Sequence, residues 1–473
     1  MPTETILLLV ILASGLYMAW NIGANDVANA MGTSVGSGAL TLRKAVMIAA
    51  VLEFSGAFFF GSHVSKTIQE GIVNSSTFSH EPLILVLGML AALIGAGAWL
   101  QIASYNGLPV STTHSIVGAI IGFGLVIGGT DAIYWENVAF IGSSWILSPL
   151  LGGALSYAIF SFLRKQIFYS ARPFQATKRL LPFFIFFTTA GLFLTLLSKN
   201  FLSLGLEFPL WAVILLSICI GSAAAIWVYS LLRKKGIKHG YVTPKNTNKA
   251  ILADLATARK HLTAAQASTS GDVGYHLGIV LEEVEGIVHN IEAGPNREQL
   301  HEEYEAVEKI FAYLQIISAC LMAFAHGAND VANAIGPLSA AVTILLSGAI
   351  HTSGGVPLWA LALGGLGIVL GLATWGWRVI ETIGKKLTEL TPSRGFSAEF
   401  GAAITILAAS RLGLPISATH TLVGSVLGVG LAKGIGALNL ATMRDILISW
   451  IVTIPIGAIM AIFFFYGLRF LFT

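Results

Sequence analysis

The sequence predicts an all-α polytopic membrane protein of about 12 transmembrane helices, built as two inverted repeats with broken or re-entrant helices. Three observations lead to this prediction: the composition, the length of the apolar runs and an internal duplication. Of the 473 residues, 55% are apolar and 11% are charged, whereas a soluble protein has roughly 25% charged residues. Apolar runs near the ~20 residues needed to cross a bilayer recur along the chain. Nucleic-acid binding and soluble enzyme classes are therefore excluded.

The apolar runs give a span map. We expect spans at about 5–23, 45–62, 82–104, 107–129, 136–163, 180–198, 208–232, 310–326, 357–377, 395–411, 413–432 and 443–470. Lys and Arg collect in residues 164–179 and 378–394, and such enrichment marks cytoplasmic loops. Both termini then face the extracytoplasmic side. The first run has no cleavage site and is expected to be a retained span. The two cysteines, Cys219 and Cys320, lie in apolar stretches and predict no disulfide framework.

Residues 233–309 differ sharply from the rest of the chain. They hold ten of the 27 basic and eleven of the 24 acidic residues. Their apolar residues recur at helical spacing, with breaks at 268–274 and 292–296. This pattern predicts a small cytoplasmic insert of about three helices. A solvated tether between two membrane halves and a regulatory element both remain open.

The chain is duplicated internally. GANDVANA at 23–30 recurs unchanged at 327–334, and GLPVSTTHSIVGAIIGFG at 107–124 recurs as GLPISATHTLVGSVLGVG at 413–430. In the span map, five spans of the first copy and two further spans precede the second copy. Because seven is odd, the two copies enter the membrane from opposite faces. Inverted repeats of this kind are typical of secondary transporters.

The duplication suggests four parts. We expect a first membrane repeat at 1–163, a basic loop with two linking spans at 164–232, the insert at 233–309, and an inverted second repeat at 310–473.

The GANDVANA motif places an acid in an apolar run. Asp26 lies between Asn25 and Asn29, and the second copy repeats this arrangement with Asn329, Asp330 and Asn333. A carboxylate inside a membrane costs about 2.5–3.5 kcal/mol even on the lenient insertion scale. A bound cation offsets that cost, because carboxylate and amide oxygens are hard ligands. The alternative is that Asn and Asp only cap a broken helix.

The second motif predicts an anion site. In GLPVSTTH, Gly107 and Pro109 break a helix, and a new helix starts directly afterwards. Free N–H groups at a helix start favour an oxyanion, and nearby hydroxyls donate further bonds. The candidate phosphate ligands are Asp26, Asn29, Ser111, Thr112, Thr113, Asp330, Asn333, Ser417 and Thr419. Ala418 stands where the first copy has Thr112, so the two half-sites are not equivalent. The alternative is that these hydroxyls only bond to carbonyls of their own helix.

Four further residues are candidates for supporting roles. His114 and His420 follow the hydroxyls and are expected to be proton carriers, neighbours of the ligands, or simply packed histidines. Glu53 and Glu399 are acids in apolar spans and should face a polar interior. They are not repeat partners, since Ile368 aligns with Glu53 and Leu93 with Glu399. Cation coordination, pairing of an acid with Arg411, or a purely structural acid remain open.

On these two motifs, each present in two copies, the chain resembles the inorganic phosphate transporter family of cation-coupled symporters. The likeness covers about 1–232 and 310–473. It implies symport of phosphate with sodium or protons in the plasma (inner) membrane, often by a homodimer. It implies that Asp26 and Asp330 are essential, that the Ser/Thr-rich turns hold phosphate, and that Glu53 and Glu399 match acids needed for transport. The departure at Ala418 puts a symmetric phosphate cradle in doubt.

The resemblance and the residues together predict a transporter that is not an enzyme and that moves phosphate by alternating access. Neither copy of the two motifs contains Lys or Arg, so co-transported cations must balance the anion. We favour sodium, bound by Asn25, Asp26, Asn329, Asp330, Glu53 and Glu399. The alternatives are proton coupling, sulfate as substrate and, more distantly, an ion channel or a phosphate sensor. The expected partners are phosphate, sodium and the lipid bilayer, and no cofactor is expected.

Overall fold

The computed structural model describes residues 3–108, 110–170, 172–197, 209–234, 247–269, 272–293, 297–350, 355–377, 380, 391–433 and 440–473. Within these ranges the structure is all-helical, with a single isolated β-bridge between Val73 and Ile133. Seven of the described helices are long and apolar enough to cross a membrane, or eight if the bent pair α2–α3 is one span.

The helices of the first half begin with the motif helix α1. Their bounds are α1 Thr3–Gly36, α2 Leu42–Phe60, α3 Ser62–Glu70, α4 Pro82–Tyr105, α5 Thr112–Phe123, α6 Trp135–Leu163, α7 Pro173–Leu196 and α8 Leu210–Lys234. The remaining helices are α9 Thr247–Ala267, α10 Asp272–Ala293, α11 Arg297–Asp330, α12 Ala332–Ser347, α13 Leu358–Thr374, α15 Pro392–Arg411, α16 Ala418–Lys433 and α17 Leu440–Phe472.

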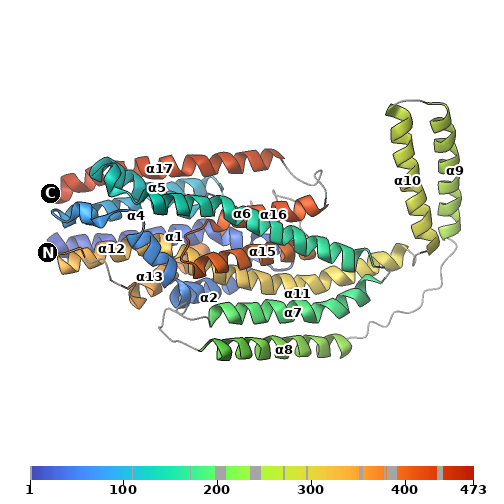
Figure 1. Cartoon of the computed structure of the whole chain (residues 1–473), viewed down its shortest axis with the longest axis horizontal. Coiled ribbons are helices and arrows are strands. Elements are labelled where there is room, and N and C mark those ends of the chain that lie inside the picture. The colour runs from blue at the N-terminus through green and yellow to red at the C-terminus, as the bar shows by residue number, and fades with distance from the viewer. Residues whose placement is uncertain are drawn as a thin grey trace. The chain divides into compact units, whose positions relative to one another are not determined.

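The chain divides into two compact units. The first comprises 1–162, 188–221 and 310–473, and the second comprises 163–187 and 222–309. In the first unit α1 packs against α4 and α13, and α17 lies along α4 and α5 (Figure 1). In the second unit α9 packs against α10, and the Tyr304 hydroxyl donates to the Phe168 carbonyl at 2.7 Å. The four-part division expected from the sequence stays a prediction.

The first GANDVANA motif lies inside α1, and the second spans the short break between α11 and α12. The spans expected at 5–23 and 310–326 are shorter than the helices that contain them. α1 continues through the first motif to Gly36, and α11 runs to Asp330, with α12 following from Ala332. Polar side chains lower the hydropathy without breaking backbone hydrogen bonds, so the helix continues where the apolar run ends. At the break between α11 and α12 the N-cap residue is Val331, and α12 has no side-chain capping bond. The motif asparagines therefore do not cap a helix.

The segment expected as a span at 107–129 is a short helix. α5 has 12 residues and continues as one π-helical turn to Gly128. With α4 it forms a helical hairpin, and α15 and α16 form the corresponding hairpin in the second copy. Gly107 and Gly413 turn the two hairpins with φ of 65° and 69°, values that glycine adopts without steric cost. The pair α2–α3 forms a broken helix that bends by 62° at Gly61. The exact count of twelve spans and the inversion of the repeats remain predictions.

Candidate functional site

The six polar residues of the two GANDVANA motifs are buried together in the first unit. Asn25, Asp26 and Asn29 lie on α1, Asn329 and Asp330 end α11, and Asn333 lies on α12. Each of the six is 1% exposed. Small residues make this burial possible, because a Cβ atom at Gly23 would overlap the backbone carbonyl of Ile368. The motif therefore sits where helices approach most closely.

The first asparagine of each motif holds a hairpin tip. The Asn25 amide donates to Ser104 Oγ at 2.8 Å and to the Leu108 carbonyl at 3.2 Å. These bonds join α1 to the turn between α4 and α5. Because its N–H groups are used in this way, Asn25 positions the tip of the first hairpin.

The second copy repeats these contacts. The Asn329 amide donates to Ser410 Oγ at 3.0 Å and to the Leu414 carbonyl at 3.2 Å. Since Ser410 and Leu414 are the repeat partners of Ser104 and Leu108, both hairpin tips are fixed by the same chemistry.

The two hairpin tips meet at the starts of α5 and α16. Ser111 Oγ accepts from the His114 N–H, and Ser417 Oγ accepts from the His420 N–H, both at 3.2 Å. These serines are therefore N-caps. The helix starts contact each other across the copies, because the Thr113 hydroxyl donates to the Ile416 carbonyl at 2.9 Å. Two positive helix ends thus face one small region, which is the arrangement that favours an oxyanion.

The second asparagine of each motif reaches the hairpin of the other copy. The Asn29 amide donates to Thr419 Oγ1 at 2.8 Å. The Asn333 amide donates to Thr113 Oγ1 at 3.1 Å and to Thr112 Oγ1 at 3.2 Å. The predicted phosphate ligands of both copies are thereby brought into one cluster.

His326 lies at the centre of the acids and was not predicted. Its Nε2 is 2.9 Å from Asp330 Oδ2 and 3.7 Å from Asp26 Oδ2, and its Nδ1 is 3.3 Å from Glu53 Oε1. The residue is completely buried. It directly precedes the second motif, where the first copy has Ile22. Extending the alignment of the repeats by one residue would have revealed this basic side chain.

The two glutamates occupy different places. Glu53 pairs with His326 and so belongs to the central cluster. Glu399 lies in a pocket of donors: it accepts from Thr33 Oγ1, from Ser34 Oγ at 2.7 Å, from Ser318 Oγ at 2.6 Å and from Gln315 Nε2 at 3.4 Å.

The pairing of an acid with Arg411 that the sequence left open is not formed by Glu399. Arg411 is exposed, whereas Glu399 is completely buried.

The central cluster has a surplus of buried acceptor oxygens. Among the described residues no hydrogen-bond donor reaches Asp26 Oδ2, Asp330 Oδ1, or the Oδ1 atoms of Asn29, Asn329 and Asn333. Asp26, His326 and Asp330 also offer ligand atoms within 4.8 Å of one another. Buried polar atoms are normally paired, and these are atoms that accept and do not donate. The arrangement therefore fits cations beside an anion held at the helix starts.

The two candidate histidines lie behind the helix starts. The His114 and His420 rings are 4.3 Å apart, and they pack on Trp145 and Trp450 at 3.9 and 3.5 Å, respectively. His114 Nδ1 contacts the Trp450 carbonyl at 3.4 Å. These contacts fix the rings against α6 and α17, which supports the packed interpretation of both histidines.

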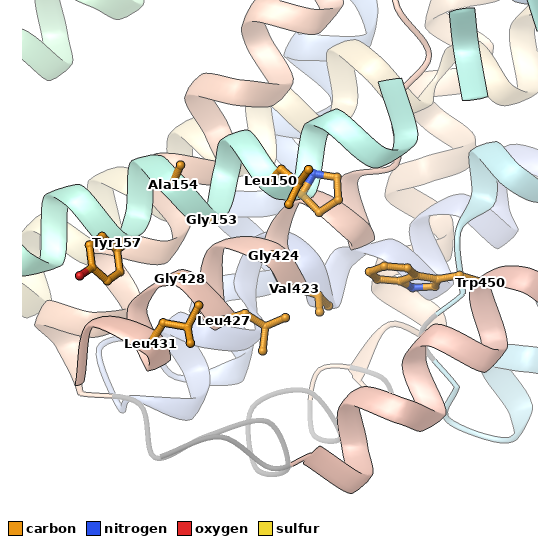
Figure 2. Close-up of a pocket in the computed structure, with 11 residues that line it drawn as sticks. Leu150, Gly153, Ala154, Tyr157, Val423, Gly424, Leu427, Gly428, Leu431 and Trp450 are labelled. Atoms are coloured by element: carbon orange, nitrogen blue, oxygen red, sulfur yellow. The ribbon is translucent and has the colours of Figure 1, made fainter. Parts of the chain in front are cut away.

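A groove between α6, α16 and α17 is not a site for an anion. Figure 2 shows its lining, which includes Leu150, Tyr157, Val423, Leu427 and Leu431, around about 380 Å³ of space. The lining has no charged side chain. Leu150 and Leu431 are 64% and 50% exposed, as expected of a surface in contact with lipid.

The long apolar helices define an integral membrane protein, and its centre is a buried cluster lined with oxygen atoms. Comparison with known proteins makes the class specific. The model of the phosphate transporter family matches residues 22–461, and the chain belongs to this family.

Two relatives illustrate the relationship. The inorganic phosphate transporter 2-1 of Arabidopsis thaliana chloroplasts is 47% identical over 454 residues, which cover 95% of this chain and 70% of that protein. A solved structure described as the sodium-dependent phosphate transporter is 37% identical, with a TM-score of 0.80, and the match covers 98% of this chain and 99% of that one. The predicted resemblance is thereby confirmed.

Proposed function

We propose that this protein is a symporter that moves inorganic phosphate together with sodium by alternating access. One observation carries the proposal: among the described residues, no hydrogen-bond donor reaches the buried atoms Asp26 Oδ2, Asp330 Oδ1 and the Oδ1 atoms of Asn29, Asn329 and Asn333. Two carboxylates and an arriving anion repel one another unless positive charge accompanies them. Cation and anion binding are then coupled, and by linkage each ligand raises the affinity for the other.

The phosphate is assigned to the two helix starts. Ser111, Thr112 and Thr113 lie at the start of α5, and Ser417 and Thr419 lie at the start of α16. The two starts contact each other through the Thr113 hydroxyl and the Ile416 carbonyl. Asp26, Asp330, Asn29 and Asn333 border this region, and a carboxylate accepts a hydrogen bond from the acidic proton of phosphate. Sulfate has no such proton near neutral pH, so this environment favours phosphate.

The cations are assigned to the acids and to the unpaired amide oxygens. Asp26, Asp330, Glu53 and the Oδ1 of Asn329 supply hard oxygen ligands in the central cluster. Asn25 donates both of its hydrogen bonds to the hairpin, so we assign it a positioning role. Glu399 lies in its own pocket of hydroxyl and amide groups and provides a separate place for a cation. His326 supplies part of the positive charge within the protein.

The rest of the proposal concerns architecture. The crossed contacts between motif and hairpin, and the matching of Gly23 to Ile368 and of Gly327 to Glu53, support two repeats of inverted orientation. All central residues are closed off in this structure, so exchange with either side requires the repeats to move. We place the protein in the plasma (inner) membrane as a homodimer, with both termini extracytoplasmic and residues 233–309 cytoplasmic.

Uptake by proteoliposomes tests this function. Purified protein is reconstituted, and initial uptake of radioactive phosphate is measured at fixed pH with an inward gradient of sodium chloride or choline chloride. Accumulation above equilibrium only with sodium is expected. Undiminished uptake in choline would end the sodium assignment and favour protons. Loss of labelled uptake in equimolar sulfate would show that the site does not prefer phosphate.

A further inference from the structure

The second asparagines of the two motifs have unequal hydrogen-bond partners. On α12, the Asn333 amide group donates to two hydroxyls, Thr113 Oγ1 and Thr112 Oγ1. On α1, the Asn29 amide group donates to one hydroxyl, Thr419 Oγ1 at 2.8 Å, and to a carboxylate oxygen, Asp26 Oδ1 at 3.0 Å. A side-chain amide carries two N–H groups. Both N–H groups of each asparagine therefore donate hydrogen bonds, but to different partners.

Ala418 explains the difference. Thr419 and Ala418 are the repeat partners of Thr113 and Thr112. The bond from Asn29 to Thr419 reproduces the bond from Asn333 to Thr113. The hydroxyl that would take the second N–H of Asn29 is missing at Ala418, and that N–H turns to the carboxylate of its own motif.

The consequence reaches the two acids. Asp26 Oδ1 also lies 3.3 Å from Thr419 Oγ1, so this oxygen has two donors. Asp330 has no such amide donor: His326 Nε2 lies 2.9 Å from its Oδ2, and its Oδ1 has no hydrogen-bond donor within the described part of the chain. Donors at a carboxylate oxygen withdraw charge that a cation would otherwise use. The Asn29 N–H, which has no counterpart at Asp330, therefore weakens Asp26 as a cation ligand.

We infer that Ala418 lowers the cation affinity of Asp26, by directing an N–H group of Asn29 onto this carboxylate. This inference rests on the proposed sodium-coupled transport. It makes residue 418 a specificity residue that sets the sodium dependence of uptake through Asn29, without itself touching the cation.

Two single variants, Ala418→Thr and Thr112→Ala, test the inference. In Ala418→Thr, a hydroxyl beside Asn29 releases Asp26 Oδ1, and the sodium concentration for half-maximal uptake should fall about fivefold. That factor corresponds to the difference between a hydrogen bond to a charged acceptor and one to a neutral acceptor. In Thr112→Ala, the freed N–H of Asn333 turns toward Asp330, and the half-maximal sodium concentration should rise. A merely structural effect would not shift the two variants in opposite directions.

The matched control is Ala119→Ser. Ala119 is buried in α5 two turns beyond the site, and its repeat partner is Ser425, so the second copy already carries a hydroxyl at this position. The control should keep the sodium dependence of the parent. Sodium titrations are run at saturating phosphate, and phosphate titrations at saturating sodium.

The outcomes separate the inference from the function beneath it. If the parent protein shows no sodium dependence, the proposed function fails. If the parent depends on sodium and Ala418→Thr has the same half-maximal sodium concentration, the inference is overturned and the function stands. If only the KM for phosphate changes, residue 418 acts on the anion and the inference is also overturned.

Discussion

Replacing the buried pair of His326 and Glu53 by two isoleucines separates its structural role from its transport role. The other repeat already shows an apolar version of this pair. Ile22 precedes the first motif as His326 precedes the second. The backbone of Ile368 packs against Gly23, and the backbone of Glu53 packs against Gly327 in the same way. Both isoleucines are completely buried. Two isoleucines therefore fit this environment.

The expected magnitudes follow from burial. His326 and Glu53 are each 0% exposed, and breaking a buried ion pair by removing one partner costs about 3–5 kcal/mol. His326→Ile also leaves Asp26 and Asp330 without their basic neighbour. Replacing both partners of a buried pair by apolar residues is often neutral. The double variant His326→Ile/Glu53→Ile should thus lie within about 2 kcal/mol of the parent.

Thermal unfolding of the purified protein in detergent measures this difference. We expect the double variant to unfold well above His326→Ile and close to the parent. The recovery should be larger in sodium chloride than in choline chloride, because Asp26 and Asp330 still repel each other. Uptake by the double variant should remain low, since a cation ligand is lost with Glu53. A double variant that unfolds at or below the temperature of His326→Ile would refute the reasoning.

Three further predictions concern single residues. Asp26→Asn and Asp330→Asn should each abolish sodium-driven phosphate uptake with normal amounts of protein in the membrane; near-normal uptake by either variant would contradict its role. Gly327→Ala should lose more than about 1–3 kcal/mol, the usual range for overpacking, because its Cβ would overlap the backbone of Glu53. Gly142→Ala meets nothing within 4 Å and is the control, both being compared by thermal unfolding. Glu399→Gln should fold normally, since an amide oxygen still accepts the surrounding bonds, but should lower the sodium-driven uptake rate; unchanged uptake would remove Glu399 from the cation path.

Much of the site could be predicted because duplication makes it visible. Asp26 and Asp330 stand out because acids are costly in apolar runs, and the identical motifs show that both copies matter. The hydroxyls at the helix starts could be found from Gly107 and Pro109 and their repeat. The helix boundaries could not, since hydropathy falls at the motif asparagines while the backbone bonds of α1 continue.

The amino-acid sequence by itself determined the membrane class, the repeats and the residue types of the site, because composition and repetition are local properties of the chain. Only the tertiary structure decided which partners meet. Thr33 bonds Glu399 across 366 positions, and Asn29 bonds Thr419 across 390. His326 gains its role from Glu53, which lies on another helix. Such contacts depend on how the helices cross, and neither spacing nor hydropathy within one segment encodes that crossing.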